Sequence, residues 1–237
     1  MKRSKRVITG TCRDVTAHSA AMKNMKIEDF RQKINALPKH ITLVNMDETP
    51  VYFNSIPKRT VTSKGEKHVK ARKPGDEKKR VTVVLGCCSN GEKLPPMVIT
   101  KQSLRGVTVP QGMLLRRQPK AWMTSDLMLD WFSHCRTYIK DKHLLLDSFS
   151  GHKTKQVTDT FGSSNTAYTL IPPGCTSELQ PLDLGLNKPF KDRLKRKWLQ
   201  NQAQNCRISL EKLLSWISDC WNSITTVSIL NSFKAAL

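Results

Sequence analysis

The sequence predicts an α/β protein, in which a mixed β-sheet is flanked by helices and followed by a C-terminal helical extension. Two observations carry this prediction. Several apolar or β-branched segments follow one another early in the chain, and helices then alternate with strands. In addition, the run Leu144-Leu-Leu-Asp147 is apolar up to its aspartate, as expected of a strand buried on both faces. With 237 residues the chain can bury one large core or two small ones.

The amino-terminal part predicts one helix followed by strands. Apolar residues recur at helical spacing over residues 27–37, and a proline closes this helix. Residues 41–48 are predicted to form a buried strand that ends in two carboxylates. Thr49-Pro50 then predicts a turn into a second strand at 51–53.

The middle of the chain contains the clearest β pattern. Residues 80–88 are rich in β-branched side chains and predict a strand. Asn90-Gly91 is a hairpin turn signal, after which 93–100 returns as an edge strand with its prolines at the start. Residues 101–123 show no regular pattern and are expected to be irregular.

Helices and strands alternate in the next part. Residues 124–140 predict a helix whose start is capped by the Thr-Ser-Asp sequence. The strand 144–147 follows, then a short polar helix or loop at 151–161 and another strand at 166–171. An antiparallel meander followed by β–α alternation is the element order of the ribonuclease-H-like fold.

The carboxyl-terminal part predicts two further helices. Asn187 is expected to cap the first, with Pro189 tolerated in its first turn. Residues 210–224 form an amphipathic helix, which is expected to cover the core, with a homodimer surface as the alternative. We therefore expect a basic linker or remnant at 1–40, the ribonuclease-H-like domain at 41–204 and a C-terminal amphipathic helix at 205–237.

The charge balance favours a polyanionic partner. The chain has 40 Lys and Arg against 19 Asp and Glu, a formal net charge of +21. Such a field favours nucleic acid first and a membrane surface second, but no segment approaches the ~18 consecutive apolar residues of a membrane span. Seven cysteines without a Cys-x-x-Cys pair indicate core thiols in a reducing compartment. We expect DNA as the partner, and neither a membrane nor a small-molecule substrate.

Basic clusters are the candidate phosphate contacts. The segment 58–80 holds ten Lys or Arg against three Asp or Glu, and a second basic run occupies 188–197. A solvated charged face is the alternative interpretation of both. The predicted nucleic-acid contacts are Lys70, Arg72, Lys73, Lys78, Lys79, Arg80, His152, Lys191, Lys195, Arg196 and Lys197.

Three aspartates are the candidate catalytic residues. Asp47 and Asp147 each end a predicted strand, and Asp183 precedes the basic helix. If their strands are neighbours, Asp47 and Asp147 lie at one end of the sheet, and the loop before the basic helix can bring Asp183 beside them. Three clustered carboxylates are stable only with cations between them. Mg²⁺ or Mn²⁺ fits this ligand set, with two ions in an active enzyme. Glu48 should point to the opposite face of its strand and is not counted as a ligand. The alternative is that each aspartate only caps a turn or helix.

Five separated motifs in order give the chain a family resemblance over roughly residues 41–200. They are Asn45-Met-Asp-Glu-Thr-Pro50, Arg80-Val-Thr-Val-Val-Leu85 with Asn90-Gly-Glu-Lys-Leu-Pro-Pro-Met-Val-Ile99, Ala121-Trp-Met-Thr124, Leu144-Leu-Leu-Asp-Ser-Phe-Ser-Gly-His152 and Ile171-Pro-Pro-Gly-Cys-Thr-Ser-Glu-Leu-Gln-Pro-Leu-Asp183. Together they resemble the DDE superfamily endonuclease domain of pogo/Tigger-type transposases (the Tc1/mariner group) and of host proteins derived from them.

The resemblance implies a ribonuclease-H-like fold and a metal-dependent centre for DNA strand cleavage and transfer. Asp47, Asp147 and Asp183 match its three acidic ligands, and the 35 residues between the last two suit the all-aspartate branch. Full-length members carry helix-turn-helix modules of the centromere-protein-B kind ahead of this domain, which 1–40 is too short to hold.

Three functional hypotheses follow for a nuclear DNA-binding protein. The first is a Mg²⁺- or Mn²⁺-dependent endonuclease and transposase. The second is a domesticated, catalytically silent DNA-binding or chromatin-interaction module, so whether the chain is an enzyme stays open. The third is ribonuclease H itself. His152 is a candidate to orient a metal-bound water or to contact DNA, with a hydrogen-bonded turn residue as the alternative.

Overall fold

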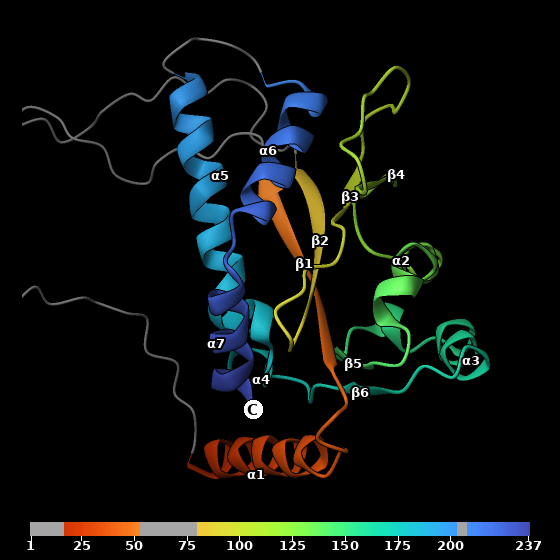
Figure 1. Ribbon diagram of the computed structural model, residues 1–237, viewed down its shortest axis with the longest axis vertical. Coiled ribbons are helices and arrows are strands. Elements are labelled where there is room, and N and C mark those ends of the chain that lie inside the picture. The colour runs from red at the N-terminus through yellow and green to blue at the C-terminus, as the bar shows by residue number, and fades with distance from the viewer. Residues whose placement is uncertain (1–16, 53–79, 203–207) are drawn as a thin grey trace, which may run out of the picture.

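A six-stranded mixed sheet forms the centre of the computed structural model, which describes residues 17–52, 80–202 and 208–237 (Figure 1). Its strand order is β4-β3-β2-β1-β5-β6. The strands are β1 (Leu43–Tyr52), β2 (Arg80–Cys88), β3 (Met97–Thr100), β4 (Leu114–Arg117), β5 (His143–Leu146) and β6 (Tyr168–Leu170). β2 is antiparallel to β1 and β3, whereas β5 and β6 continue parallel to β1. The predicted mixed sheet is confirmed.

Helices cover both faces of this sheet. One face packs on α2 (Ser125–Ile139) and α3 (Lys155–Ser163). The other face packs on the remaining helices, of which α5, α6 and α7 lie together on one side in Figure 1. They are α1 (Ala17–Asn35), α4 (Thr176–Leu179), the π turn η2 (Leu182–Leu186), α5 (Asn187–Gln202), α6 (Leu210–Asn222) and α7 (Thr226–Ala236). The single turn η1 (Ser150–His152) follows β5.

The first strand is longer than the sequence predicts. β1 continues through Thr49 and Pro50, where we predicted a turn, and pairs with β2 to its end at Tyr52. Proline lacks the N–H of a strand residue and is tolerated where that group has no partner. β5 pairs only with residues 43–45 of β1, so the strand on this side needs no hydrogen bond from Pro50.

The chain enters α5 through a π turn that the sequence did not predict. Pro181 already has helical dihedral angles, and the N–H of Asn187 bonds to the carbonyl of Leu182. Asn187 is therefore inside a helix and not its cap, which corrects the prediction. Gly185 lets α7 approach this turn, because a Cβ at Gly185 would lie 2.9 Å from the Cβ of Ser232.

The carboxyl-terminal segment belongs to the same core as the sheet. The apolar face of α6 is buried, so the predicted core-covering role is confirmed and this face is not free as a dimer surface. A second helix, α7, follows it and was missed, as were β4 and α4. At the other end, Phe30 and Ile34 of α1 pack into the same apolar cluster. This part of 1–40 therefore forms a packed helix.

Two further sequence expectations can be compared with the described residues. The cysteines in this part of the chain (87, 88, 135, 175 and 220) are free and buried, as expected of core thiols. Among the described helices, none is long and apolar enough to cross a membrane.

Candidate active site

One buried asparagine ties together the three elements that carry the predicted catalytic aspartates. Asn45 of β1 is fully buried. Its amide nitrogen donates to the carbonyl of Leu145 in β5 (3.0 Å), and its Oδ1 accepts from the N–H of Leu182 at the start of η2 (3.1 Å). Asp47 and Asp147 lie two residues beyond the paired Asn45 and Leu145, and Asp183 directly follows Leu182. The fold therefore ties together the three segments that carry the aspartates, with Asp47 inside β1 and Asp147 directly after β5.

Asp47 and Asp183 are joined by a single side-chain amide. The Nδ2 of Asn187 donates to Asp47 Oδ2 at 2.6 Å and to Asp183 Oδ1 at 3.0 Å. Asp47 is buried, whereas Asp183 is exposed. Burial, followed by the charges of Asp183 and Glu48, raises the pKa of Asp47 well above its usual range, although the bond from Asn187 opposes this. In the folded protein the ionised form of Asp47 is therefore disfavoured, first by burial and then by the neighbouring negative charges.

Asp147 is held by a histidine that also binds Glu48. The Nδ1 of His152 lies 2.8 Å from Asp147 Oδ1, and its Nε2 lies 3.0 Å from Glu48 Oε1. Burial alone would lower the pKa of His152, but these two carboxylates outweigh it and raise the pKa to about 10. The ring is thus an imidazolium whose two nitrogens both donate. Burial likewise acts to raise the pKa of Asp147, but the bond and charge of His152 lower it.

Glu48 belongs to the site, although sequence reasoning set it aside. It lies opposite Val84, which is buried under α2 and α3, so it does leave β1 on the other face from Asp47. Strand alternation does place Glu48 and Asp47 on opposite faces, but the ring of His152 spans from the Glu48 face to Asp147. Within the described residues, the compact set of potential metal-ligating groups is Glu48, Asp147 and His152, whose atoms lie within 4.8 Å of one another.

Each of the three aspartates has one oxygen held and one left open. Asn187 holds Asp47 Oδ2 and Asp183 Oδ1, while His152 and the N–H of Phe149 hold Asp147 Oδ1. Within the described part of the chain, the second carboxylate oxygen of each aspartate accepts no hydrogen bond. Carboxylate oxygens are the ligands that Mg²⁺ and Mn²⁺ prefer, and a cation would relieve the repulsion at Asp47. The residues present therefore fit a divalent metal.

Two of the predicted basic residues follow the carboxylates along α5. Lys191 and Lys195 come one and two turns after Asn187, and both are exposed. They line a hollow that also includes Pro50 and Tyr52 of β1. None of the three aspartates lines this hollow, so the two lysines are related to the carboxylates by their position on α5 after Asn187.

Other predicted basic residues have different surroundings. His152 is 1% exposed and both of its ring nitrogens are bound to carboxylates, which favours the hydrogen-bonded alternative over a DNA contact. Lys197 is paired with Asp219 at 2.8 Å, and the guanidinium of Arg80 lies over the ring of Trp122. Arg196 is exposed. The remaining predicted contacts lie outside the described residues: Lys70, Arg72, Lys73, Lys78 and Lys79.

Comparison with known proteins now identifies the family. Residues 78–233 match the family model described as DDE superfamily endonuclease. The chain belongs to this family. It is 38% identical over 213 residues, 80% of the chain, to the Homo sapiens protein "Pogo transposable element with KRAB domain", and 34% identical over 248 residues, 93% of the chain, to the Mus musculus protein of the same name. It spans 34% and 40% of the length of these two relatives. The pogo-type DDE resemblance drawn from the motifs is confirmed.

Solved structures confirm the fold of this DDE domain. The Mos1 strand transfer complex superposes with a TM-score of 0.63 at 12% identity, covering 100% of this chain and 63% of that one. The Mos1 mariner paired end complex with Mn gives 0.62 at 14% identity, covering 100% and 64%. The ribonuclease-H-like architecture of a transposase catalytic domain is therefore the architecture of this chain.

Proposed function

We propose that this DDE domain is a divalent-metal-dependent DNA endonuclease and strand-transfer centre in which Asp47, Asp147 and Asp183 hold Mg²⁺ or Mn²⁺. One observation carries the proposal. Asp47, Asp147 and Asp183 come from three segments that Asn45 ties together, and each has one carboxylate oxygen bound by a protein donor, while within the described residues no hydrogen bond reaches the other oxygen. The Mos1 structure with Mn supports this choice of metal by analogy of fold.

The protein residues prepare the site before any cation arrives. Asn45 fixes the three elements relative to one another, and Asn187 and His152 fix the orientation of the carboxylates. When bound, two divalent cations would activate a water or a 3′-hydroxyl and stabilise the leaving oxygen of a phosphodiester. Lys191 and Lys195 would contact the DNA backbone, because both are exposed and follow Asn187, which binds Asp47 and Asp183, along α5. These roles imply a protein that works on DNA in the nucleus.

A cleavage assay tests the enzymatic part of the proposal. Purified chain is incubated with end-labelled duplex DNA and Mn²⁺, with Asp147→Ala as the test variant. Removal of a metal ligand costs several kcal/mol of transition-state stabilisation, so we expect the cleavage rate to fall more than about 100-fold. Asp130→Ala removes an exposed carboxylate of α2, 44% exposed and paired with Arg116, and should cut like the parent.

The other outcomes distinguish the alternatives. Equal cutting by Asp147→Ala and parent would overturn the metal-ligand assignment. DNA binding without cutting, unchanged when all three aspartates become alanine, would favour the catalytically silent module. Preferential cutting of RNA–DNA hybrids would favour ribonuclease H. A homodimer stays a proposal, for which light scattering of the chain with and without DNA is the measurement.

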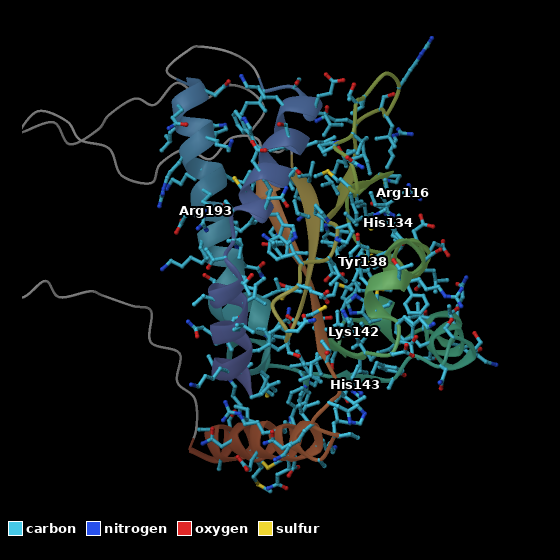
Figure 2. All side chains as sticks on the ribbon, viewed as in Figure 1. Arg116, His134, Tyr138, Lys142, His143 and Arg193 are labelled. Atoms are coloured by element: carbon cyan, nitrogen blue, oxygen red, sulfur yellow. The ribbon has the colours of Figure 1, made fainter. Side chains whose placement is uncertain are left out.

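DNA affinity should depend on the lysines of α5. The double variant Lys191→Ala with Lys195→Ala removes two proposed phosphate contacts, so the plot of log K against log salt should become shallower by roughly 1.8. Figure 2 shows Arg193 on α5 and Tyr138 on α2, on opposite sides of the sheet. The control therefore removes two exposed charges from α2, Arg136 and the adjoining Lys140, and should leave that slope nearly unchanged. Equal slopes for both double variants would contradict the assignment.

A further inference from the structure

Asn187 is a buried polar residue with an unusual division of its hydrogen bonds. It is 4% exposed and directs its single amide nitrogen at two carboxylates, Asp47 and Asp183. The two protons on that nitrogen suffice for one bond to each carboxylate. By contrast, its Oδ1 is buried and has no hydrogen-bond partner among the residues that the structure describes. The residue thus satisfies two acids with its donor side and leaves its acceptor side unsatisfied.

The negative charge around Asn187 explains this arrangement. A buried acceptor without a hydrogen bond destabilises the folded state. Turning the amide over would instead place Oδ1 within about 3 Å of two carboxylate oxygens, where like partial charges repel. The bonds to Asp47 and Asp183 therefore determine the orientation of the amide, at the expense of its own oxygen. Such an arrangement is expected where the distance between two carboxylates matters for function.

We propose that Asn187 is a positioning residue that holds Asp47 and Asp183 side by side, so that one divalent cation can bind both through their open oxygens. This inference rests on the proposed metal-dependent function, and it adds a residue that contributes no ligand atom. Asp47 comes from β1 and Asp183 from the π turn η2, so nothing in the local chain fixes their distance. The amide of Asn187 lies within 3.0 Å of both and supplies that constraint.

Mn²⁺ affinity is the direct measure of this role. Free Mn²⁺ is followed by its EPR signal during titration of parent, Asn187→Ala and Asn187→Leu, the second of which keeps the buried volume. Groups that orient metal ligands typically contribute 10–100-fold in affinity, so both variants should bind Mn²⁺ at least about tenfold more weakly. The melting temperature without metal is recorded for each protein, to separate folding from positioning.

Asn201→Ala is the matched control, because the chain offers a second buried asparagine on the same helix. Asn201 is also 4% exposed, and it lies fourteen residues further along α5, about 21 Å away. Its removal should lower the melting temperature without changing Mn²⁺ affinity. Mn²⁺ binding by the Asn187 variants within twofold of the parent would overturn the inference.

Failure of this inference can be told apart from failure of the proposed function. A parent protein that binds no Mn²⁺ removes the function and the inference with it, whereas a parent that binds and Asn187 variants that bind equally well remove only the inference. If neither variant folds, the side-chain amide protons of Asn187 are followed by NMR during Mg²⁺ titration of the parent. They should shift along the binding curve, and resonances that stay fixed while Mg²⁺ binds would overturn the inference.

Discussion

Replacing Asp47 by asparagine is expected to abolish Mn²⁺-dependent DNA cleavage and, at the same time, to make the metal-free protein more stable. Burial and the charges of Asp183 and Glu48 raise the pKa of Asp47 well above 3.8, so its ionised form is unfavourable in the folded chain. Asparagine removes that charge, and its oxygen can still accept the bond from Asn187. Asparagine therefore avoids the free-energy cost of the ionised form, and the melting temperature of the metal-free variant should rise by roughly 2–4 °C for each kcal/mol gained in a chain of this size.

The sign of the pH dependence follows from the raised pKa. The folded state of the parent holds the Asp47 proton more tightly than the unfolded state does, so its stability falls as pH rises above 3.8. The asparagine variant lacks this loss, and the gap between the two should widen from acidic to neutral pH. Thermal unfolding in EDTA measures the gap. Added Mn²⁺ should raise the melting temperature of the parent and leave that of the variant unchanged.

Asp130→Asn provides the control for this experiment. It makes the same chemical change at an exposed carboxylate paired with Arg116, and surface pairs of this kind contribute about 1 kcal/mol or less. A destabilised Asp47→Asn variant would contradict the view of Asp47 as a strained carboxylate. A variant that still cleaves DNA would contradict its assignment as a ligand.

The sheet could be predicted because its strands carry their own signals. β2 is rich in β-branched residues, and β5 is an apolar run, as expected of a strand that is buried between two neighbouring strands. The strands that carry Asp47 and Asp147 could be placed side by side from the same argument, since β1 and β5 are parallel neighbours, although Asp47 lies inside β1 and not at its end. β4 and α7 were missed, because the first has only four residues and the second follows a helix without a strong break signal.

The groups that orient the aspartates were harder to predict, because their roles come from contacts across the fold. Asn45 bonds to residues 100 and 137 positions away, and Asn187 bonds to Asp47 over 140 positions. The sequence did contain a signal for Asn45, because a side-chain amide within a buried strand rarely lacks a hydrogen-bond partner. For Asn187 the local pattern favoured a helix cap, and only the unpredicted π turn places it inside the helix facing both acids.

Replacing His152 by alanine is expected to destabilise the metal-free protein by about 3 kcal/mol, or roughly 10 °C in melting temperature. Removing one member of a buried charged set leaves its partners uncompensated, which typically costs 3–5 kcal/mol. Removing the buried ring of His152 breaks its contacts with Glu48 and Asp147 at once. The lower end of the range applies, because the side chains of Glu48 and Asp147 are 16% and 28% exposed and water can reach them.

The cost should shrink as pH rises, because the stabilising form of His152 is the imidazolium. Its pKa is about 10 in the folded protein against an ordinary 6.5, so its contribution is complete below pH 6.5 and is lost as pH rises toward 10. His143 gives a matched comparison. Its buried ring bonds to Thr169, and burial lowers its pKa, so the cost of His143→Ala should stay constant between pH 7 and 10. A pH-independent cost for His152→Ala would mean that Glu48 and Asp147 do not hold a charged ring, and that Asp147 is oriented by the N–H of Phe149 alone.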